Sequence, residues 1–283
     1  MRWLITGSGG LLGREVVKVL TGEEVSAMTH QALDISDPVA VAKAVNGHDT
    51  VINCAGYTKV DLAEANEAEA TAVNGHGVWN LARACAHTGA TLLHVSSDYV
   101  FSGTSRTPYR EDAAPGPLNA YGRSKLVGEM AVLHLLPRTG YVVRTAWLYG
   151  TGGPCFVATM LRLAAERETV SVVDDQFGQP TWARDLAGQL VALGRCRDAP
   201  PGIYHGTSGG STTWFGLAKE LFRLSGLAPE RVLPIPAVRF PLPAQRPVYT
   251  VLGHERWQTT GIRELGPWHD RLRLALDESN FNR

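Results

Sequence analysis

Short apolar runs alternate with amphipathic segments along the first half of the chain. The runs with the length of strands are "W-L-I-T" (3–6), "E-V-S-A-M" (24–28), "T-V-I-N-C" (50–54), "T-L-L-H-V-S-S" (91–97) and "Y-V-V-R-T-A-W" (141–147). Segments with helical spacing lie between them, at 15–20, 38–45, about 63–87 and from 124 onward. Because strands and helices that alternate regularly form parallel sheets with helices on both faces, we predict an α/β fold of this kind.

The second half has a looser pattern, in which glycines and prolines separate shorter helical pieces. These pieces lie at about 155–167, 182–194, 212–225 and 266–278. Loops rich in glycine and proline interrupt regular structure. We therefore predict two units, a sheet domain at 1–147 and a smaller lobe at 148–283, with some segments of the lobe returning to the sheet.

The balance of charges narrows the classes of partner. The 283 residues include 27 Lys and Arg and 27 Asp and Glu, which gives zero net charge at pH 7. We expect no nucleic-acid or membrane partner, because these call for a basic cluster or a long apolar span. Four cysteines without C-x-x-C spacing, and an N-terminus without a signal-peptide pattern, favour a reducing cytoplasm.

Three glycines follow the first predicted strand at G-x-x-G-x-x-G spacing. They are Gly7, Gly10 and Gly13 in "T-G-S-G-G-L-L-G". A pyrophosphate at a helix N-terminus needs a tight turn and open backbone N–H groups, so this context indicates a dinucleotide site, with a ligand-free turn as the alternative. No acidic residue stands at Thr29 or His30, where the second strand should end, which favours NADPH and leaves NADH open.

A phenol and an ammonium stand four residues apart in "Y-G-R-S-K", where a turn-rich segment becomes helical. On a helix, Tyr121 and Lys125 lie one above the other. A cation within about 4–6 Å lowers the pKa of a phenol, so the pair suits proton transfer to a carbonyl oxygen. The alternative is that the two residues only cap and solubilise a helix. Asp37 before Pro38 is predicted to cap an earlier helix.

Several longer motifs together resemble the dTDP-4-dehydrorhamnose reductase family within the extended short-chain dehydrogenase/reductase superfamily. They are "V-I-N-C-A-G-Y-T-K-V-D", "S-S-D-Y-V-F-S-G", "P-L-N-A-Y-G-R-S-K-L-V-G-E", "R-T-A-W-L-Y-G", "D-D-Q-F-G-Q-P-T" and "Q-R-P". The resemblance runs nearly end to end. It implies a Rossmann-type doubly wound parallel sheet at 1–147 that binds NAD(P), a substrate-binding lobe at 148–283, and reduction of the 4-keto group of a dTDP-4-keto-6-deoxyhexose.

The resemblance also implies roles for individual residues. The catalytic triad would be Ser97, Tyr121 and Lys125. The cofactor would contact Tyr121 and Lys125. It would also contact Gly7, Gly10, Leu11, Leu12, Gly13, Asp34, Ile35, Ala55, Gly56 and Tyr57. The sugar nucleotide would contact Thr58, Val60, Asp98, Tyr99, Trp147 and Arg246, although Arg246 would serve equally in an ion pair. Asp98 and Tyr99 can also be interpreted as turn residues, and Trp147 as core.

A metal is not expected. The nine histidines lack metal-ligand spacing, and Arg184 stands where family members with a metal-linked dimer have a glutamate, although Glu15 is present. The assembly is then a monomer or a homodimer.

Other functions on the same scaffold stay open. A 4,6-dehydratase or epimerase needs an Asp-Glu pair after the hydroxyl residue, whereas Tyr99 follows Asp98 here. A silent NAD(P)-binding regulatory protein would not need an intact triad. The natural substrate is dTDP-4-dehydrorhamnose or another dTDP-4-keto sugar.

Overall fold

A six-stranded parallel sheet forms the centre of the computed structural model, which describes residues 1–278. Its strands are β1 (Arg2–Thr6), β2 (Glu24–Met28), β3 (Thr50–Asn53), β4 (Thr91–Ser97), β5 (Gly140–Thr145) and β10 (Gly202–His205). They are arranged in the order β10-β5-β4-β3-β1-β2, and every neighbouring pair is parallel. The predicted Rossmann-type doubly wound sheet is confirmed.

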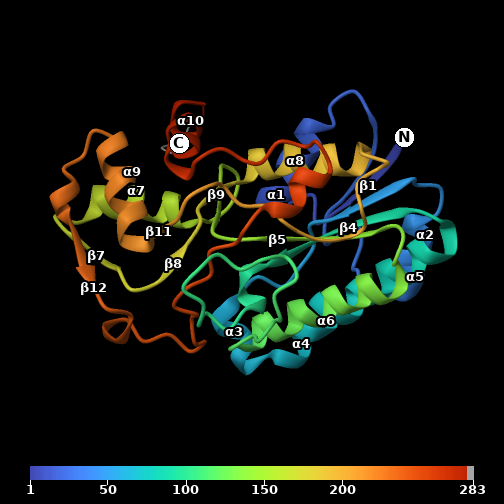
Figure 1. Cartoon of the computed structure of the whole chain (residues 1–283), viewed down its shortest axis with the longest axis horizontal. Coiled ribbons are helices and arrows are strands. Elements are labelled where there is room, and N and C mark those ends of the chain that lie inside the picture. The colour runs from blue at the N-terminus through green and yellow to red at the C-terminus, as the bar shows by residue number, and fades with distance from the viewer. Residues whose placement is uncertain (279–283) are drawn as a thin grey trace.

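Helices cover both faces of this sheet (Figure 1). One face carries α1 (Leu11–Val19) and α8 (Ala183–Arg195), and the other carries α2 (Pro38–Val45), α5 (Val78–Thr88) and α6 (Ala120–Leu135). Successive side chains of a strand point to opposite faces. Accordingly, Trp3 and Ile5 pack under α1 and α8, while Leu4 packs under α2 and α5, and all three are fully buried.

The cap of α2 forms as the sequence predicts. The Asp37 side chain accepts hydrogen bonds from the backbone N–H groups of Val39 and Ala40, and Pro38 occupies the first helical position. These bonds pair two of the N–H groups that a helix leaves free at its start.

The predicted helix at 63–87 is interrupted, which corrects the prediction from periodicity. The chain forms α3 (Val60–Ala65), α4 (Glu67–Thr71), a π-helical turn (Ala72–Gly77) and then α5. Two contacts accompany the π-helical turn. Asn74 turns inward to bond with other segments, and Gly75 passes so close to Val127 that a Cβ would lie 2.7 Å from its Cγ1. Such turns mark functional sites in many helices.

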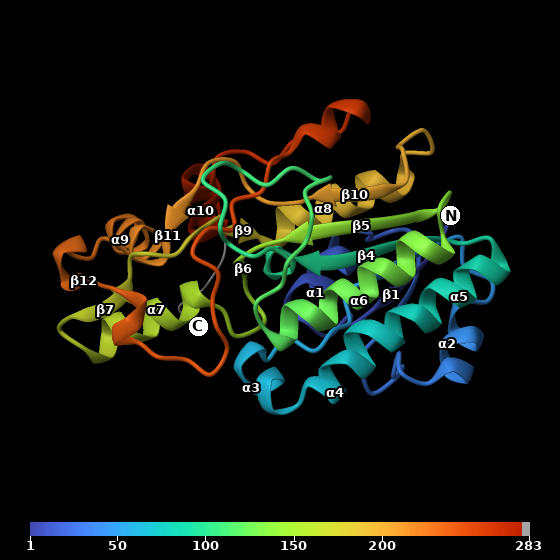
Figure 2. The ribbon, with the colours of Figure 1, turned by 60° about the horizontal axis from the view of Figure 1, so that its bottom comes forward.

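The smaller lobe lies beyond the carboxyl end of β5 (Figure 2). It contains α7 (Phe156–Glu166), α9 (Trp214–Leu224) and α10 (Trp268–Glu278), and the two-stranded pairs β6 (Leu148–Tyr149) with β9 (Thr181–Trp182), β7 (Val170–Val173) with β12 (Val232–Ile235), and β8 (Phe177–Gly178) with β11 (Thr212–Thr213). The three helices and the first two of these strand pairs share a core of their own. Between them the chain returns to the main sheet as α8 and β10.

The predicted unit boundaries of 1–147 and 148–283 remain a prediction, and residues 279–283 lie outside the described residues. Within residues 1–278, no helix combines the length and the apolar character that crossing a membrane requires.

A buried ion pair joins α6 to the sheet. The Nε and NH2 groups of Arg144, on β5, donate to the two carboxylate oxygens of Glu129 at 2.9 and 2.7 Å. Ser96 on β4 donates to the same carboxylate at 2.6 Å. The side chains of Glu129 and Arg144 are only 1% and 2% exposed. Neither charge can be left unpaired at this depth without a large desolvation penalty.

We predict that Glu129→Gln and Arg144→Met each lower the free energy of unfolding by about 3–5 kcal/mol, because each strands one buried charged or polar partner. The double variant Glu129→Leu/Arg144→Met should lose much less, since no unpaired charge remains. Urea unfolding followed by circular dichroism measures all three. As a control, Arg162→Ala removes an exposed pair with Glu166 and should change stability by less than about 1 kcal/mol. Single variants as mild as this control would contradict the prediction.

Candidate active site

The glycine-rich turn between β1 and α1 lies where the strand order reverses. From β1 the sheet continues to β2 on one side and to β3 on the other, and ligands of open α/β sheets bind at the carboxyl ends beside such a point. Gly7 has φ of 66°, and a Cβ there would lie 2.5 Å from the Ala55 nitrogen. Gly13 is equally crowded, since its Cβ would lie 2.3 Å from the Gly7 oxygen.

The first turn of α1 has open backbone N–H groups. Gly10 is the N-cap residue and supplies no side-chain hydrogen bond. Leu12 is buried in the core, and half-buried Leu11 lies against Gly150 and Gly153 of the smaller lobe. The turn therefore presents donors and the positive end of the helix dipole to an anion, with apolar walls around them.

The end of β2 carries no carboxylate. This strand ends at Met28, and Thr29 follows with its methyl group 3.5 Å from the position of a Cβ on Gly9. Asp34 is exposed and accepts hydrogen bonds from both the backbone and the hydroxyl of Ser36, which lower its pKa. Ile35 is buried against Gly77, the last residue of the π-helical turn, which also contains Asn74.

The loop after β3 is held by Asn74. Its Oδ1 accepts from the Tyr57 N–H at 2.9 Å, and its Nδ2 donates to the Tyr57 carbonyl at 3.0 Å and to the Ser124 hydroxyl at 2.9 Å. A Cβ on Gly56 would lie 3.0 Å from Asn74 Oδ1 and 3.9 Å from Lys125 Nζ. The predicted cofactor loop is thus brought against the predicted catalytic lysine.

Sequence reasoning missed Asn74. The signal was its place in "A-V-N-G-H-G", where two glycines interrupt a helical pattern. Fully buried and bonded to three groups, it joins the loop after β3 to the start of α6.

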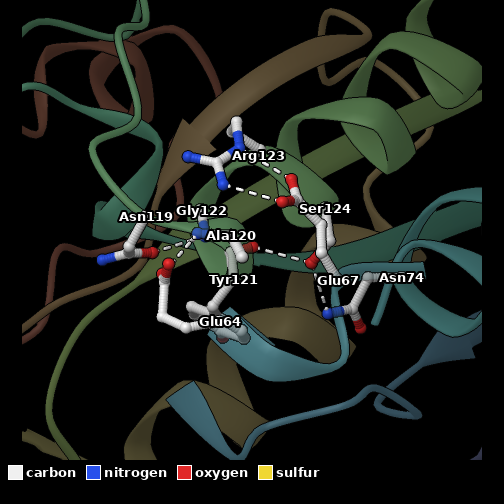
Figure 3. A network of polar contacts seen from close by, with 9 residues as sticks. All are labelled: Glu64, Glu67, Asn74, Asn119, Ala120, Tyr121, Gly122, Arg123 and Ser124. Atoms are coloured by element: carbon white, nitrogen blue, oxygen red, sulfur yellow. Dashed lines mark hydrogen bonds and ion pairs between the residues drawn. The ribbon is translucent and has the colours of Figure 1, made fainter. Parts of the chain in front are cut away.

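The first turn of α6 is fixed by side chains from other segments (Figure 3). Asn119 accepts from the Gly122 N–H at 2.8 Å, and Glu64 accepts from the Ala120 N–H at 2.8 Å. Ser124 donates to the Tyr121 carbonyl at 2.7 Å. Arg123 forms a two-pronged pair with Glu67 on α4. The start of α6, which carries Tyr121, is therefore held by Asn119, by Glu64 on α3 and by Glu67 on α4.

Ser97, Tyr121 and Lys125 meet at the carboxyl end of β4. The Ser97 hydroxyl donates to Asp98 Oδ1 at 2.9 Å and accepts from the Tyr99 N–H at 3.2 Å. Lys125 is 5% exposed, and its Nζ donates to the Val95 carbonyl at 2.7 Å. The Tyr121 hydroxyl lies near the Ser97 hydroxyl, which lowers the pKa of the phenol.

Burial dominates the pKa values of these groups. It raises the pKa of Tyr121 to about 12, against a lowering effect of the Ser97 hydroxyl, and it raises the pKa of Asp98 to about 6. It lowers the pKa of Lys125 to about 8, although the Glu129 carboxylate opposes this. We expected Lys125 to lower the pKa of Tyr121. Instead the pKa of the phenol is raised, because desolvation outweighs the lowering effect of the Ser97 hydroxyl and the Asp98 carboxylate raises the pKa further.

Two of the residues predicted for the sugar nucleotide, Tyr99 and Arg246, lie beside this centre. Tyr99 packs edge-on against Tyr121, with ring centroids 5.9 Å apart. Arg246 lies beside the Tyr99 hydroxyl, where it opposes the rise in the pKa of Tyr99 that burial causes. Both NH groups of Arg246 donate to Asp61 on α3 at 2.8 Å, so the ion pair that the sequence left as an alternative is formed. Val60 immediately precedes Asp61 on the chain, and Thr58 lies three residues before it.

Trp147 has an unusual backbone conformation. Its φ is 45°, and it is the one non-glycine with positive φ in the part of the chain described. For a bulky side chain this region costs about 1–3 kcal/mol, and such strain persists where surrounding contacts enforce it. The Trp147 ring stacks on Trp214, with centroids 3.5 Å apart and an angle of 11°. The pairing of β4 with β5 places Thr145 opposite Ser97. Trp147 therefore follows only two residues after the position opposite Ser97.

The residues considered for a metal have other partners. Glu15 accepts from Lys18 at 2.6 Å, and Arg184 pairs with Glu278. Among residues 1–278, no three His, Cys, Asp or Glu side chains are grouped so that they could hold a metal ion.

Comparison with known proteins gives matches over nearly the whole chain. It is 52% identical over 285 residues to a dTDP-4-dehydrorhamnose reductase of Streptomyces griseus, covering 98% of this chain and 92% of that protein. It is 50% identical over 279 residues to a dTDP-4-keto-6-deoxy-D-glucose reductase of Streptomyces niveus, covering 97% and 96%. The crystal structure of a dTDP-4-dehydrorhamnose reductase from Bacillus anthracis in complex with NADP has a TM-score of 0.94 at 36% identity, covering 98% of this chain and 99% of that chain.

A family model described as the RmlD substrate binding domain matches residues 1–281. The resemblance to dTDP-4-dehydrorhamnose reductases that the motifs predict is confirmed by this match and by the relatives. The chain is therefore a member of the RmlD substrate binding domain family and has the fold of the extended short-chain dehydrogenases/reductases.

Proposed function

We propose that this protein is an NADPH-dependent reductase of the 4-keto group of a dTDP-4-keto-6-deoxyhexose, with dTDP-4-dehydrorhamnose as substrate and dTDP-L-rhamnose as product. In this proposal residues 1–147 hold the cofactor and residues 148–283 mainly hold the sugar nucleotide. Two relatives at 50–52% identity, both named as reductases of dTDP-4-keto sugars, support an oxidoreductase acting on such sugars. The four free cysteines suit a reducing cytoplasm.

One observation carries the proposal. Ser97 from β4 and Tyr121 from α6 are in contact, and Lys125, one turn along α6, lies against the loop that follows β3. A hydroxyl, a phenol and an ammonium therefore converge at the end of the strands, a short distance from the glycine turn. This is the set of groups that protonates a carbonyl oxygen while hydride reaches its carbon.

The residues present fit the dinucleotide. A Cβ at Gly7 or Gly13 would collide with backbone, so the turn has the close geometry that a pyrophosphate site requires. The open N–H groups of α1 would hold the phosphates, Ile35 would lie beside the adenine, and Lys125 would reach the nicotinamide ribose from its place beside Gly56. Bound there, NADPH supplies the hydride.

Tyr121 supplies the proton. With a pKa near 12 the phenol is protonated at neutral pH, so it is available as an acid before reduction begins. As charge grows on the carbonyl oxygen, Tyr121 gives its proton to that oxygen and Ser97 donates a hydrogen bond to it. For this the Ser97 hydroxyl must turn from Asp98, which is adjacent, toward the substrate.

In the proposed mechanism Lys125, one helical turn from Tyr121, is the cation available to the phenolate that this transfer leaves behind, although its ammonium is bonded to the Val95 carbonyl in the structure. Its ammonium is almost fully buried, where an opposite charge interacts more strongly than in water. Glu129, one turn further along α6, favours the charged form of Lys125. The lysine is therefore charged below about pH 8 and loses its charge above it.

A second candidate substrate has support of its own. The relative named dTDP-4-keto-6-deoxy-D-glucose reductase is nearly as similar as the one named dTDP-4-dehydrorhamnose reductase, at 50% against 52% identity. A 4-ketoreductase for another dTDP-deoxysugar would use the same triad. Product analysis by NMR after incubation with both sugars separates the two candidates.

We predict that NADPH is used at least as well as NADH, because no carboxylate stands at the end of β2 to repel a 2′-phosphate. Thr29→Asp introduces that charge and should lower kcat/KM for NADPH by about tenfold, which is about 1.4 kcal/mol. Thr29→Asn, with the same shape and no charge, is the matched control. Initial rates at 340 nm with both cofactors measure the preference. A wild-type enzyme that strongly prefers NADH would contradict the prediction that the end of β2 selects NADPH.

We predict that Tyr121→Phe lowers kcat by about 10²–10⁴-fold, the usual contribution of general acid catalysis. The ring keeps its packing against Tyr99, so the melting temperature and the Kd for NADPH should stay within error of the wild type. Stopped-flow rates, fluorescence titration and thermal unfolding give the three values. A folded variant with kcat within a few-fold of the wild type would rule out the phenol as the acid.

We predict that kcat of the wild type falls as pH rises through about 8, because Lys125, whose pKa is lowered, then loses its charge. Lys125→Met should have a low kcat, a raised Kd for NADPH, and no alkaline decline in that range. Measuring kcat from pH 6 to about pH 9.5 in both proteins checks the sign. An alkaline limb that persists unchanged in Lys125→Met would assign it to another group.

A further inference from the structure

Two segments of the smaller lobe enclose the ring of Trp147. Trp214 covers one face, with the two rings nearly parallel and their centroids 3.5 Å apart. Gly178 lies over the other face, because a Cβ there would be 2.5, 2.6 and 2.8 Å from three adjacent ring atoms. The middle atom, Cε2, is nearer than the two atoms bonded to it, which places this position above the plane of the ring, since a point in the plane outside Cε2 would be nearer to those two neighbours. Any side chain larger than hydrogen at position 178 would push the indole away.

The two sides of this clamp belong to one small sheet. β8 and β11 are antiparallel, and their register places Gly178 opposite Thr212. Trp214 follows β11 directly as the first residue of α9, whose N-cap Thr213 accepts from the Gly216 N–H at 3.0 Å and donates to Asp174 at 2.6 Å. The spacing between the two sides is therefore fixed by strand pairing and by a capped helix.

Trp147 itself comes from the end of β5, close to the level of Ser97. Its left-handed backbone turns the side chain into the clamp, so the strain there has a structural cause. With both faces covered, only the edge of the ring is available to a ligand. The indole N–H has no acceptor within residues 1–278 and is not one of the enclosed unpaired polar atoms, so it is free to donate to a ligand.

We infer that Gly178 and Trp214 are positioning residues, which hold Trp147 edge-on so that its N–H and ring edge select the pose of the hexose ring above Ser97 and Tyr121. The inference rests on the proposed function, since it concerns the same site. Its consequence is that sugar selectivity depends on a residue of α9 that need not touch the sugar. It also explains the glycine in "D-D-Q-F-G-Q-P-T", which the triad does not.

Three variants test the clamp. Trp214→Ala removes one face, and the KM for the preferred sugar nucleotide should rise by about tenfold or more, with a smaller change in kcat and the Kd for NADPH within about twofold. The ratio of kcat/KM between dTDP-4-dehydrorhamnose and dTDP-4-keto-6-deoxy-D-glucose should move toward one. Trp214→Phe keeps a planar face and should restore most of the KM and the ratio. Trp214→Leu fills the space without a planar face and should behave like Trp214→Ala.

A spectroscopic signature reports the clamp without turnover. Stacked indoles give an exciton couplet in circular dichroism, which should vanish in both Trp214→Ala and Trp214→Phe. Trp79→Ala is the matched control, because Trp79 is a 43% exposed tryptophan on α5 that stacks on His134. It should change neither the couplet nor KM. If Trp214→Ala does not fold, the comparison of Trp214→Leu with Trp214→Phe decides the same question.

The outcomes separate the two levels of the argument. A wild type that reduces neither sugar nucleotide overturns the proposed function and the clamp with it. A wild type that is active, together with folded Trp214→Ala or Trp214→Leu proteins whose KM and substrate ratio are unchanged, overturns the clamp alone. A rise in KM in Trp214→Leu that is absent in Trp214→Phe supports the clamp.

Discussion

The attachment of α6 to β4 and β5 is the constraint on which the site depends. Lys125 bonds to the Val95 carbonyl, Glu129 accepts from Ser96, and Tyr121 meets Ser97, so three successive strand residues contact one face of the helix. The ion pair of Glu129 with Arg144 extends this attachment to the next strand. A shift of α6 by one residue would break all of these contacts and bury an unpaired charge. The register of helix on sheet is therefore fixed by electrostatics as well as by packing.

That register places groups with opposed requirements side by side. Desolvation strengthens the electrostatic interactions of Tyr121, Asp98 and Lys125. It also raises the pKa of Tyr121 and Asp98 and lowers the pKa of Lys125, so it favours the neutral form of each group. Glu129 offsets part of this for the lysine, at a distance of one helical turn. The carboxylate that anchors the helix thus also favours the charged form of Lys125. In the proposed mechanism, stability and catalysis would share this one residue.

The sequence predicted those parts that depend on local pattern. Alternating runs gave the parallel sheet, Asp37 with Pro38 gave the cap of α2, and glycine spacing gave the turn after β1. Long-range partners could not be predicted in this way. Asn74, Asp61 and Trp214 act through residues at least 17 positions away, as in the bond from Asn74 to Tyr57, and the π-helical turn has no periodicity of its own.

The expected direction of the Tyr121 pKa was wrong, because the spacing of Tyr121 and Lys125 on a helix indicates a nearby charge and does not indicate burial. The residue roles carried over from the family stay predictions.

The late return of the chain to the sheet has a consequence for how the protein is made. β10 completes the edge beside β5, although β5 ends at Thr145 and β10 begins only at Gly202, and α8 covers Trp3 of β1 from 180 or more residues further along the chain. A ribosome that has released only the first 147 residues has exposed a sheet with one apolar face covered by α1 but not by α8, and with one edge unpaired, which favours aggregation. The nascent chain must therefore wait for residue 205 before its first half can close. Part of the smaller lobe, from β6 to β9, is synthesised during that interval, so this part of the lobe emerges before the sheet is complete.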